Sequence, residues 1–473
     1  MSIALPVFCL ADLAHGGRDV ALPLAIPLAS AGVLRLEAWL RVLPGQRYVG
    51  RGVWQDATGA RRQVLAKLLM GKKAARQFAR EQNGALLLAA QDLPAPALLA
   101  AEYVAGDGGW LLFEFLENAR APGAEDIDAA VRAIARLHAR GLWQEDLHPD
   151  NLLLQDGQLC FVDGGGIRAE MPGRALSPGL ALENLGMFCA QWPIGMEAGL
   201  SGALAAYRAQ NPDSGARMEA SALRRAVARQ RRARLRDWLR KITRECSSFH
   251  VRKQGAFGFC VARRDAEEGI APILENPDAC IAAGHLYKDG GTATVARVEA
   301  SGRTFIVKRY NIKHFRHALG RFWRRSRAWH AWREGNRLLA LGIPTARPLA
   351  LIERRWFWFS GVAYLVMEYL PGEDILHRLQ AGDTAANAAE IAAVGALFAD
   401  LVRARLSHGD MKGSNLIWHE KEARWALIDL DAMRAHCQHL TFTRAHRRDC
   451  RRFLRNWPPD SPLAHHFFEL LHK

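Results

Sequence analysis

Short apolar runs bounded by turn residues alternate along the chain with longer segments whose apolar residues recur at helical spacing. Apolar runs at 64–69 and 110–116 predict buried strands, and the segments at 72–88 and 127–140 predict helices. The pattern therefore predicts an α+β protein in which strand-rich segments precede helical ones.

The same order of elements returns in the second half of the chain. Residues 286–298 and 304–310 predict a strand, a turn and a second strand, and a further strand is expected at 364–370. A predicted helix at 385–405 follows.

One stretch in the second half carries residues suited to phosphoryl transfer. It reads HGDMKGSNLI, and ALIDLD follows shortly after it. Phosphoryl transfer needs a carboxylate that orients the attacking hydroxyl, and carboxylate and amide oxygens that bind magnesium. Asp410 fits the first role, and Asn415 and Asp429 fit the second. Lys412 can offset charge on the moving phosphoryl group. The alternative is an ordinary loop whose Asp and Asn side chains form turn hydrogen bonds.

A second copy of this arrangement lies in the first half. It reads QEDLHPDNLLL and is followed by LCFVDGGG. Asp146, Asn151 and Asp163 take the corresponding positions, and the first Asp and the Asn are five residues apart in both copies. Repetition of a whole unit predicts two similar domains, which we place at residues 1–245 and 246–473.

Composition is compatible with two domains and favours an anionic partner. The 473 residues are 49% hydrophobic, which is enough for two separate cores. A formal charge of +16 and a pI near 9.9 favour a nucleotide, nucleic acid, anionic lipid or phosphorylated glycan as partner.

The cysteines and the first residues bear on the compartment. Eight cysteines are scattered without a CxxC pair, which indicates reduced thiols in the cytosol. No basic cluster precedes an apolar run at the start, so no signal peptide is expected. Pro23, Pro27, Arg35 and Glu37 interrupt the apolar segment at 21–40, so any membrane contact is expected from the side.

Two lysines stand alone inside apolar strands. Lys67 and Lys308 each need an anionic partner, because burying an unpaired ammonium group is unfavourable. Glu81 is the single acid on the helix predicted after Lys67, and Glu334 is the single acid between residues 309 and 352. We therefore expect these two Lys–Glu pairs, with a solvated helix face as the alternative for each glutamate.

Glycine pairs and strand ends indicate where a nucleotide would bind. Gly50 and Gly52 in the first half, and Gly290 and Gly291 in the second, could bring backbone amides close to phosphates, although a plain turn is equally compatible. The ends of the strands at 110–116 and 364–370 suit a hinge whose backbone holds an adenine ring, and the residues there are Glu114, Phe115, Glu368 and Tyr369.

Two basic segments carry aromatic residues. The segment at 221–244 has apolar residues at helical spacing, which suits either an anionic membrane surface or, as we favour, packing on the core of its own domain. The segment at 315–332 suits phosphate, sugar or membrane contacts, nucleic acid or a buried helix. It contains Arg316, Arg321, Arg324, Arg325 and Arg327, with Arg333 beyond it, interleaved with Phe322, Trp323, Trp329 and Trp332.

Taken together, these residues resemble the protein-kinase-like superfamily, and most closely the lipopolysaccharide core heptose kinase family. The second domain carries the stronger likeness, in KRYN from Lys308, Glu334, MEYL from Met367, HGDMKGSN and IDLD. The first domain is similar more loosely, and its DLHPDN looks like an aminoglycoside-phosphotransferase loop.

The resemblance implies two tandem protein-kinase-like domains, each with a small antiparallel-sheet lobe and a larger helical lobe. It also implies ATP and Mg²⁺ as cofactors, and phosphorylation of heptose hydroxyls on the lipopolysaccharide inner core at the cytoplasmic face of the inner membrane. By position, the nucleotide phosphates would be held by Lys67 and Lys308, oriented by Glu81 and Glu334. The acceptor hydroxyl would be oriented by Asp146 and Asp410, and magnesium bound by Asn151, Asp163, Asn415 and Asp429.

Three positions depart from the protein kinases. Gln144 stands where a His is usual, and Gly164 and Leu430 follow the metal-binding Asp in place of Phe. These departures fit kinases of small molecules. The alternatives are a RIO-like protein kinase and a scaffold in which one or both domains are pseudokinases. Binding of nucleic acid is disfavoured because it leaves the catalytic arrangement unexplained.

Overall fold

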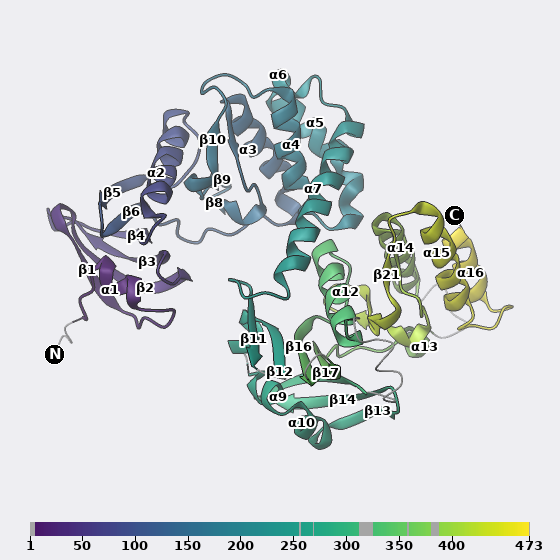
Figure 1. The fold of residues 1–473 in the computed structure, drawn as a ribbon. Helices are drawn as coiled ribbons and strands as arrows, with labels where there is room; N and C mark the ends of the chain where they lie inside the picture. Colours follow the sequence, from purple (N-terminus) through teal and green to yellow (C-terminus); the bar gives the residue numbers. More distant parts are fainter. Residues whose placement is uncertain are drawn as a thin grey trace. The chain divides into compact units, whose positions relative to one another are not determined.

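The computed structural model describes residues 5–254, 257–267, 269–311, 325–356, 359–379 and 387–472. The chain divides into two compact units (Figure 1). The first comprises Met1–Gln191 and Ala198–Arg231, and the second comprises Trp192–Glu197 and Arg232–Lys473. Each unit combines a curved antiparallel sheet with a set of helices, which confirms the α+β prediction.

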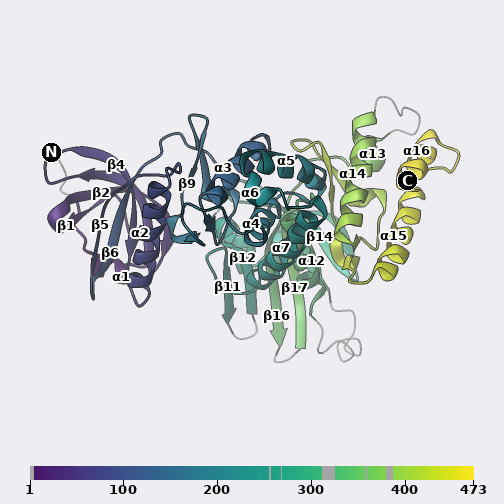
Figure 2. The ribbon, with the colours of Figure 1, turned by 90° about the horizontal axis from the view of Figure 1, so that it is seen from above.

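The first unit begins with a sheet of six antiparallel strands in the order β1-β2-β3-β4-β6-β5. Its strands are β1 (Leu24–Leu28), β2 (Gly32–Leu43), β3 (Arg47–Gln55), β4 (Arg61–Leu69), β5 (Leu98–Val104) and β6 (Gly108–Glu114). The short helix α1 (Leu10–His15) precedes it, and α2 (Ala74–Ala90) lies beside β5 and β6 (Figure 2).

A helical part completes the first unit. Its helices are α3 (Ile127–Ala139), α4 (Pro178–Cys189), α5 (Leu200–Gln210) and α6 (Pro212–Gly215). Two small strand pairs, β7 (Leu142–Gln144) with β10 (Ile167–Ala169) and β8 (Leu152–Gln155) with β9 (Gln158–Phe161), hold the loops between them.

The second unit has a seven-stranded sheet in the order β11-β12-β16-β17-β15-β14-β13. Its strands are β11 (Phe249–Gln254), β12 (Phe257–Ala262), β13 (His285–Gly290), β14 (Ala293–Ala300), β15 (Arg303–Tyr310), β16 (Pro348–Trp356) and β17 (Phe359–Glu368). Around the sheet are α8 (Arg263–Glu267), α9 (Ala271–Glu275), α10 (Pro277–Ala283) and α12 (Arg327–Leu341).

The helical part of the second unit holds its largest apolar cluster, which includes Leu397, Met411, Trp425 and Phe453. Its helices are α13 (Ile375–Arg378), α14 (Ala388–Ala404), α15 (His439–Leu454) and α16 (Pro462–His472). Two short strand pairs, β18 (Leu406–Ser407) with β21 (Arg434–Ala435) and β19 (Leu416–His419) with β20 (Arg424–Leu427), frame the loop that contains Asp410.

The two sheets share a common arrangement. In the first unit β2, β3, β4, β6 and β5 are neighbours in that order, and in the second β13, β14, β15, β17 and β16 repeat it. In both units a helix connects the third and fourth strands of the series in chain order. This is the order of elements that the repeated sequence pattern predicts.

The basic helix α7 (Ala220–Lys241) uses its apolar side chains for packing within the protein. Leu223, Ala226 and Val227 are buried near its start. Trp238 packs against a core cluster of the second unit and donates its indole N–H to Asn336 O at 3.2 Å. Of the two alternatives for the apolar residues of this helix, packing within the protein is therefore the correct one. The expectation that it packs only on the first domain's core is wrong.

The second basic segment is described in part. Its residues 312–324, which include Arg316, Arg321, Phe322, Trp323 and Arg324, lie outside the described residues. Trp332 is fully buried, and its indole donates to Ile242 O at 3.2 Å. Arg325 and Arg333 both lie against the Trp329 ring. These described aromatic residues therefore pack within the protein. Among the helices of the described ranges, none is long and apolar enough to cross a bilayer.

Candidate active site

Strand β15 places Lys308 in the interior of the second unit. Lys308 is 8% exposed and pairs across the sheet with Val295 and Leu365. Its ammonium donates to Asp429 Oδ1 at 2.6 Å and to Asp431 Oδ2 at 3.0 Å. The structure thus joins a lysine and an aspartate that lie far apart in the sequence, as the proposed roles require.

Asp429 adopts a backbone conformation that is uncommon for residues other than glycine. Its φ is 57° and its ψ is 60°, at the start of a short 3-10 helix, Leu430–Ala432. Asp and Asn tolerate this region better than most residues, and such conformations concentrate at functional sites. Burial raises the pKa of the Asp429 carboxyl, but Lys308 outweighs this, so the pKa lies below its usual value. Asp429 is therefore an anion at neutral pH.

Asp431 was not assigned a role from the sequence, yet it links three side chains of the site. Besides Lys308, it accepts hydrogen bonds from Tyr310 Oη and Arg327 Nη2, each at 2.6 Å. It lies two residues after Asp429 in the same IDLD run, and this acidic spacing was the available signal.

The loop before β19 is fixed by hydrogen bonds from both sides. Asn415 Nδ2 donates to Asp410 O at 2.9 Å, and His408 Nε2 donates to Ile428 O at 3.0 Å. Asp449 of α15 accepts the backbone N–H groups of His408 and Gly409 at 2.7 and 2.9 Å. The loop therefore has a set shape without a ligand.

The Asp410 side chain points to solvent from this fixed loop. It is 38% exposed, and its carboxylate lies 3.4 Å from Lys412 Nζ and 3.6 Å from Arg452 Nε. The two residues assigned to the chemical step, Asp410 and Lys412, are thus brought together.

A cavity of about 780 Å³ collects most of the other predicted site residues of the second unit. Its size is within the range of small-molecule sites. Lys308, Asn415 and Asp429 line one part, and Glu368 and Tyr369 line another. Gly290 and Gly291 are not among the lining residues. They form the tight turn between β13 and β14, and the next residue, Thr292, lines the cavity.

The expected pair between Lys308 and Glu334 does not form, and this prediction is wrong. Glu334 lies on α12 and is 1% exposed, but it accepts from Arg337 Nε at 2.7 Å and from Arg333 Nη1 at 3.3 Å. The pair was predicted from the positions of acidic residues alone. Arg337, three residues on along the same helix, was the signal that Glu334 already had a partner.

In the first unit the corresponding lysine has the predicted partner. Lys67 on β4 is 4% exposed, and its ammonium donates to Glu81 Oε2 at 2.6 Å and to Asp163 Oδ1 at 3.5 Å. Arg47 Nη1 and the backbone N–H of Gly165 also bind the Glu81 carboxylate, at 3.3 and 3.1 Å. The predicted Lys67–Glu81 pair is confirmed.

The loop of the first unit repeats the backbone geometry of the second. Asn151 Nδ2 donates to Asp146 O at 2.7 Å, and Gln144 Nε2 donates to Asp163 O at 3.2 Å. Gln144 therefore takes the place of His408 in bridging the loop to the strand end. The Asp146 side chain is 76% exposed, with His148 Nε2 at 3.8 Å.

Gly50 and Gly52 do not form a phosphate-binding loop or a turn. Both lie inside β3, paired with Ala66 and Val64. A Cβ on Gly52 would lie 2.1 Å from Arg35 O, so glycine is required there by the close approach of β2. The turn of the hairpin formed by β2 and β3 is at Gly45 instead.

Glu114 and Phe115 lie where the sequence places them, at the end of β6. Glu114 ends the strand, and its backbone N–H donates to Ala97 O at 2.9 Å. The Arg51 guanidinium lies 5.8 Å from the Phe115 ring centroid. The neighbouring Phe113 ring lies 5.3 Å from the Lys67 ammonium.

The oxygen donors of the second unit suit a hard divalent cation. Asn415, Asp429 and Asp431 all line the same cavity and offer amide and carboxylate oxygens, the ligands that Mg²⁺ prefers. Within the described ranges, no group of three or more His, Cys, Asp or Glu side chains is arranged for a metal ion. The amide and carboxylate oxygens of Asn415, Asp429 and Asp431 are chemically suited to magnesium.

Comparisons with known proteins address the second unit. Residues 283–465 match the model of the lipopolysaccharide kinase (Kdo/WaaP) family. Among solved structures, a chain described as WaaP in complex with acyl carrier protein is similar at 20% identity and a TM-score of 0.32, over 42% of this chain and 82% of that chain. No curated protein matches the chain. The described second unit is thus similar to the lipopolysaccharide kinase (Kdo/WaaP) family over residues 283–465.

Proposed function

We propose that the second unit transfers the γ-phosphoryl group of ATP to a sugar hydroxyl, a heptose hydroxyl, of the lipopolysaccharide inner core. The observation that carries this proposal is the convergence of Lys308, Asn415 and Asp429 on one cavity, with Asp410 on the adjoining loop. This convergence lies inside the region that matches the lipopolysaccharide kinase family.

Each residue has a role that its contacts support. Bound Mg²⁺ would neutralise phosphate charge, held by Asn415 and Asp429. Lys308 would bind the nucleotide phosphates in exchange for part of its present contact with Asp429 and Asp431. The hinge residues Glu368 and Tyr369 lie on the same cavity and would border the adenine.

Asp410 would orient the acceptor. Its carboxylate would accept a hydrogen bond from the attacking hydroxyl and take the proton as the new O–P bond forms. The bond between the γ-phosphorus and the β–γ bridging oxygen would break at the same time, and ADP would leave. Lys412, 3.4 Å away, would offset negative charge on the transferred group. The Asn415–Asp410 hydrogen bond and the two Asp449 contacts keep this loop in place before the acceptor arrives.

The first unit is proposed as a second kinase-like domain. The repeated strand order, the Lys67–Glu81–Asp163 contacts and the Asn151–Asp146 hydrogen bond support this proposal. We further propose that the chain acts as a peripheral protein at the cytoplasmic face of the inner membrane, where it would meet its glycolipid acceptor.

The experiment that tests the proposal compares acceptors. The full chain is incubated with Mg²⁺ and γ-labelled ATP, together with either delipidated inner-core oligosaccharide or cell-lysate protein. We expect label on the oligosaccharide, lost when EDTA removes the metal. Label on lysate protein alone would support the RIO-like protein kinase instead, and label on neither would support the scaffold.

A further inference from the structure

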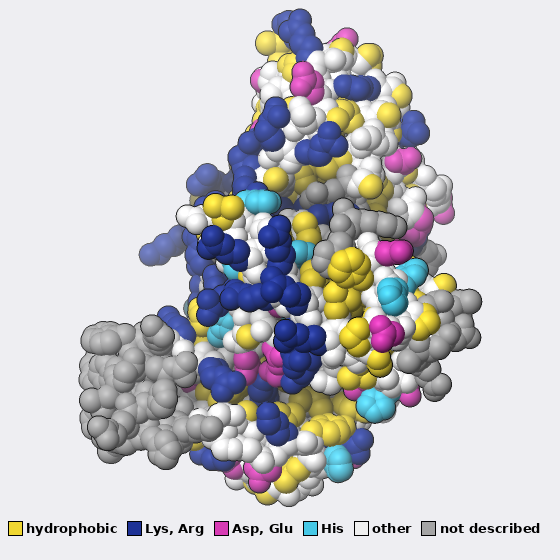
Figure 3. All heavy atoms as spheres, turned by 90° about the vertical axis from the view of Figure 1, so that its right-hand side faces the viewer, with side chains coloured by type: hydrophobic (Ala, Val, Ile, Leu, Met, Phe, Trp, Pro, Cys, Tyr) yellow, Lys and Arg dark blue, Asp and Glu magenta, His cyan; other side chains and the backbone are white. Residues whose placement is uncertain are grey.

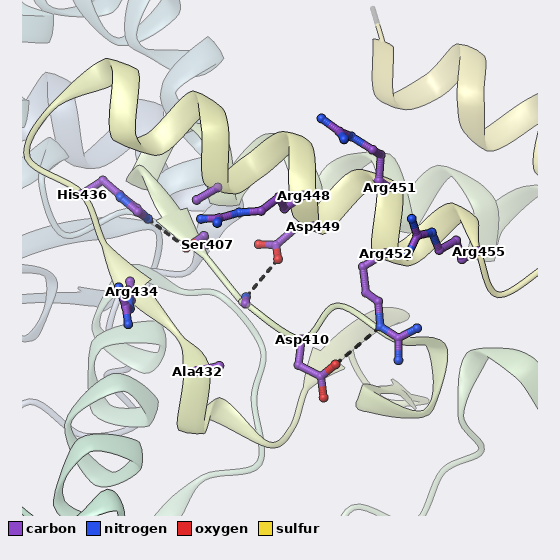
Figure 4. Close-up of a pocket in the computed structure, with 12 residues that line it drawn as sticks. Ser407, Asp410, Ala432, Arg434, His436, Arg448, Asp449, Arg451, Arg452 and Arg455 are labelled. Carbon is purple, nitrogen blue, oxygen red and sulfur yellow. Dashed lines mark hydrogen bonds and ion pairs between the residues drawn. The ribbon is translucent and has the colours of Figure 1, made fainter.

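A second cavity, of about 540 Å³, opens beside Asp410 in the second unit (Figure 4). Asp410 lines this cavity, whereas Lys308, Asn415 and Asp429 line the larger one. If the larger cavity holds the nucleotide, the smaller one is on the acceptor side of Asp410. Its wall is cationic, formed by Arg434, Arg448, Arg451, Arg452 and Arg455.

The sequence places four of these arginines on one face of a helix. Positions 448, 451, 452 and 455 are three and four residues apart, at and just after the end of α15. Arg434 comes from β21, where it pairs with Ser407, just before the Asp410 loop. Asp449 of α15 binds the same loop, so the helix and Asp410 are held in one framework.

The positive charge of this cavity is largely unneutralised. The two acids in its lining are Asp410 and Asp449. The Asp449 carboxylate accepts hydrogen bonds from two backbone N–H groups, and the Asp410 carboxylate lies 3.6 Å from Arg452 Nε. In the part of the chain that the structure describes, no carboxylate lies within ion-pair distance of Arg434, Arg448, Arg451 or Arg455. Lys and Arg side chains also gather on the face of the molecule that holds the C-terminal helices (Figure 3).

The positive charge of the cavity affects the pKa of the neighbouring His436. Burial, followed by the charges of Arg434 and Arg448, lowers the pKa of His436. His436 instead forms a hydrogen bond with Ser407 Oγ through its Nε2 atom, at 2.8 Å.

We infer that this cavity is an acceptor subsite that recognises an anionic group, a carboxylate or a phosphate, on the same sugar chain as the reacting hydroxyl. The inference rests on the proposed function. Guanidinium groups bind carboxylate and phosphate through paired, charge-assisted hydrogen bonds, and several around a hollow favour a discrete group over a flat charged surface. The anion would place the acceptor while Asp410 faces its hydroxyl.

The two sources of the anion are separated by chemistry on the acceptor. Four samples of delipidated inner-core oligosaccharide are compared as substrates: native, phosphatase-treated, carboxyl-reduced, and doubly treated. We expect one treatment to raise the acceptor KM about 10-fold or more, the effect of losing a charge-assisted contact. A raised acceptor KM after phosphatase treatment identifies a phosphate, and a raised acceptor KM after carboxyl reduction identifies a carboxylate. An unchanged KM after both treatments together would overturn the inference.

Variants of the cavity locate the effect. Arg448→Gln with Arg455→Gln removes two charges without touching Asp410, and the matched control is Arg444→Gln with Arg447→Gln, two exposed arginines of α15 outside the cavity lining. We expect the cavity variant to raise the acceptor KM about 10-fold or more for native core, and to change neither the KM for ATP nor the KM for the doubly treated core. An equal effect of the control pair would overturn the inference.

A binding measurement keeps this inference separate from the proposed function. Native core oligosaccharide is titrated calorimetrically into the full chain without ATP. Weaker binding to the cavity variant, with unchanged binding to the control, supports the subsite even if no phosphate is transferred to the core. Equal binding to all three proteins contradicts it even if transfer occurs.

Discussion

At the scale of single residues, each unit buries a lysine whose ammonium group is paired with carboxylates. A buried ammonium group needs a nearby anion. Lys67 contacts Glu81 on α2 at 2.6 Å and Asp163 at 3.5 Å, whereas Lys308 contacts Asp429 and Asp431. Under the proposed function, a nucleotide would compete with two carboxylates for Lys308, and the Glu81 carboxylate of α2 would hold Lys67.

Sequence reasoning predicted these residues better than their partners. The roles predicted for Asp410, Asn415 and Asp429 stay predictions, and the structure adds a local hydrogen bond from Asn415 Nδ2 to Asp410 O. The Lys308 partner depended on folding over 121 residues of chain, and local elimination pointed to Glu334, which Arg337 already neutralises.

His408 makes stability depend on pH. Burial lowers the pKa of His408 from its usual 6.5, so the ring stays neutral in the folded chain. Below about pH 6.5 the unfolded chain gains a proton that the folded chain does not, so stability falls as pH falls. His408→Gln keeps a side-chain N–H donor, as Gln144 provides in the first unit. The variant has no imidazole, so its unfolded chain cannot take up this proton. We expect a smaller fall in the unfolding midpoint between pH 7.5 and 5.5 in the variant.

The control for this comparison is already in the chain. His138, whose pKa burial lowers to about 4, is present in both proteins and contributes equally to their pH dependence. An identical pH slope in the variant and the wild type would mean that His408 is not buried and neutral.

At the scale of elements, close helix packing positions the first cleft. Helix α2 carries Glu81 and crosses the turn at Gly164–Gly166, which follows Asp163. A Cβ on Gly84 would lie 1.8 Å from Gly164 O, so this crossing requires glycine. The spacing of apolar residues predicted α2, but this glycine contact depends on a segment far along the chain and could not be predicted.

Gly84→Ala is expected to destabilise the first unit by about 1–3 kcal/mol, because α2 must move away from Gly164. The shift would separate Glu81 from Lys67 and weaken nucleotide binding there. Chemical unfolding and ATP titration measure both effects. The control is Gly202→Ala on α5, which meets no atom within 4 Å and is expected to stabilise by up to about 1 kcal/mol. Equal stability of Gly84→Ala and wild type would contradict the packing argument.

At the scale of the whole molecule, two units repeat one arrangement but differ in their relation to known proteins. The family match covers residues 283–465, all in the second unit. The first unit shares the strand order and the lysine, asparagine and aspartate contacts. The internal repeat predicted this shared order, because repeated spacing reflects repeated topology.

We expect two nucleotides per chain. Titration of the full chain with Mg²⁺ and a non-hydrolysable ATP analogue should give a stoichiometry of two. Lys67→Met and Lys308→Met should each weaken one site, because each removes the cation that binds phosphate, and should leave the other unchanged. A stoichiometry of one that only Lys308→Met affects would make the first unit a pseudokinase.

The most direct test of the central claim is the rate of phosphate transfer to core oligosaccharide by Asp410→Asn. Asp410 is partly exposed, so the substitution should leave the fold and the binding of Mg²⁺ and ATP intact. We predict that kcat falls about 10²- to 10⁴-fold, the usual contribution of a general base. Transfer at the full wild-type rate would contradict the assignment of this site.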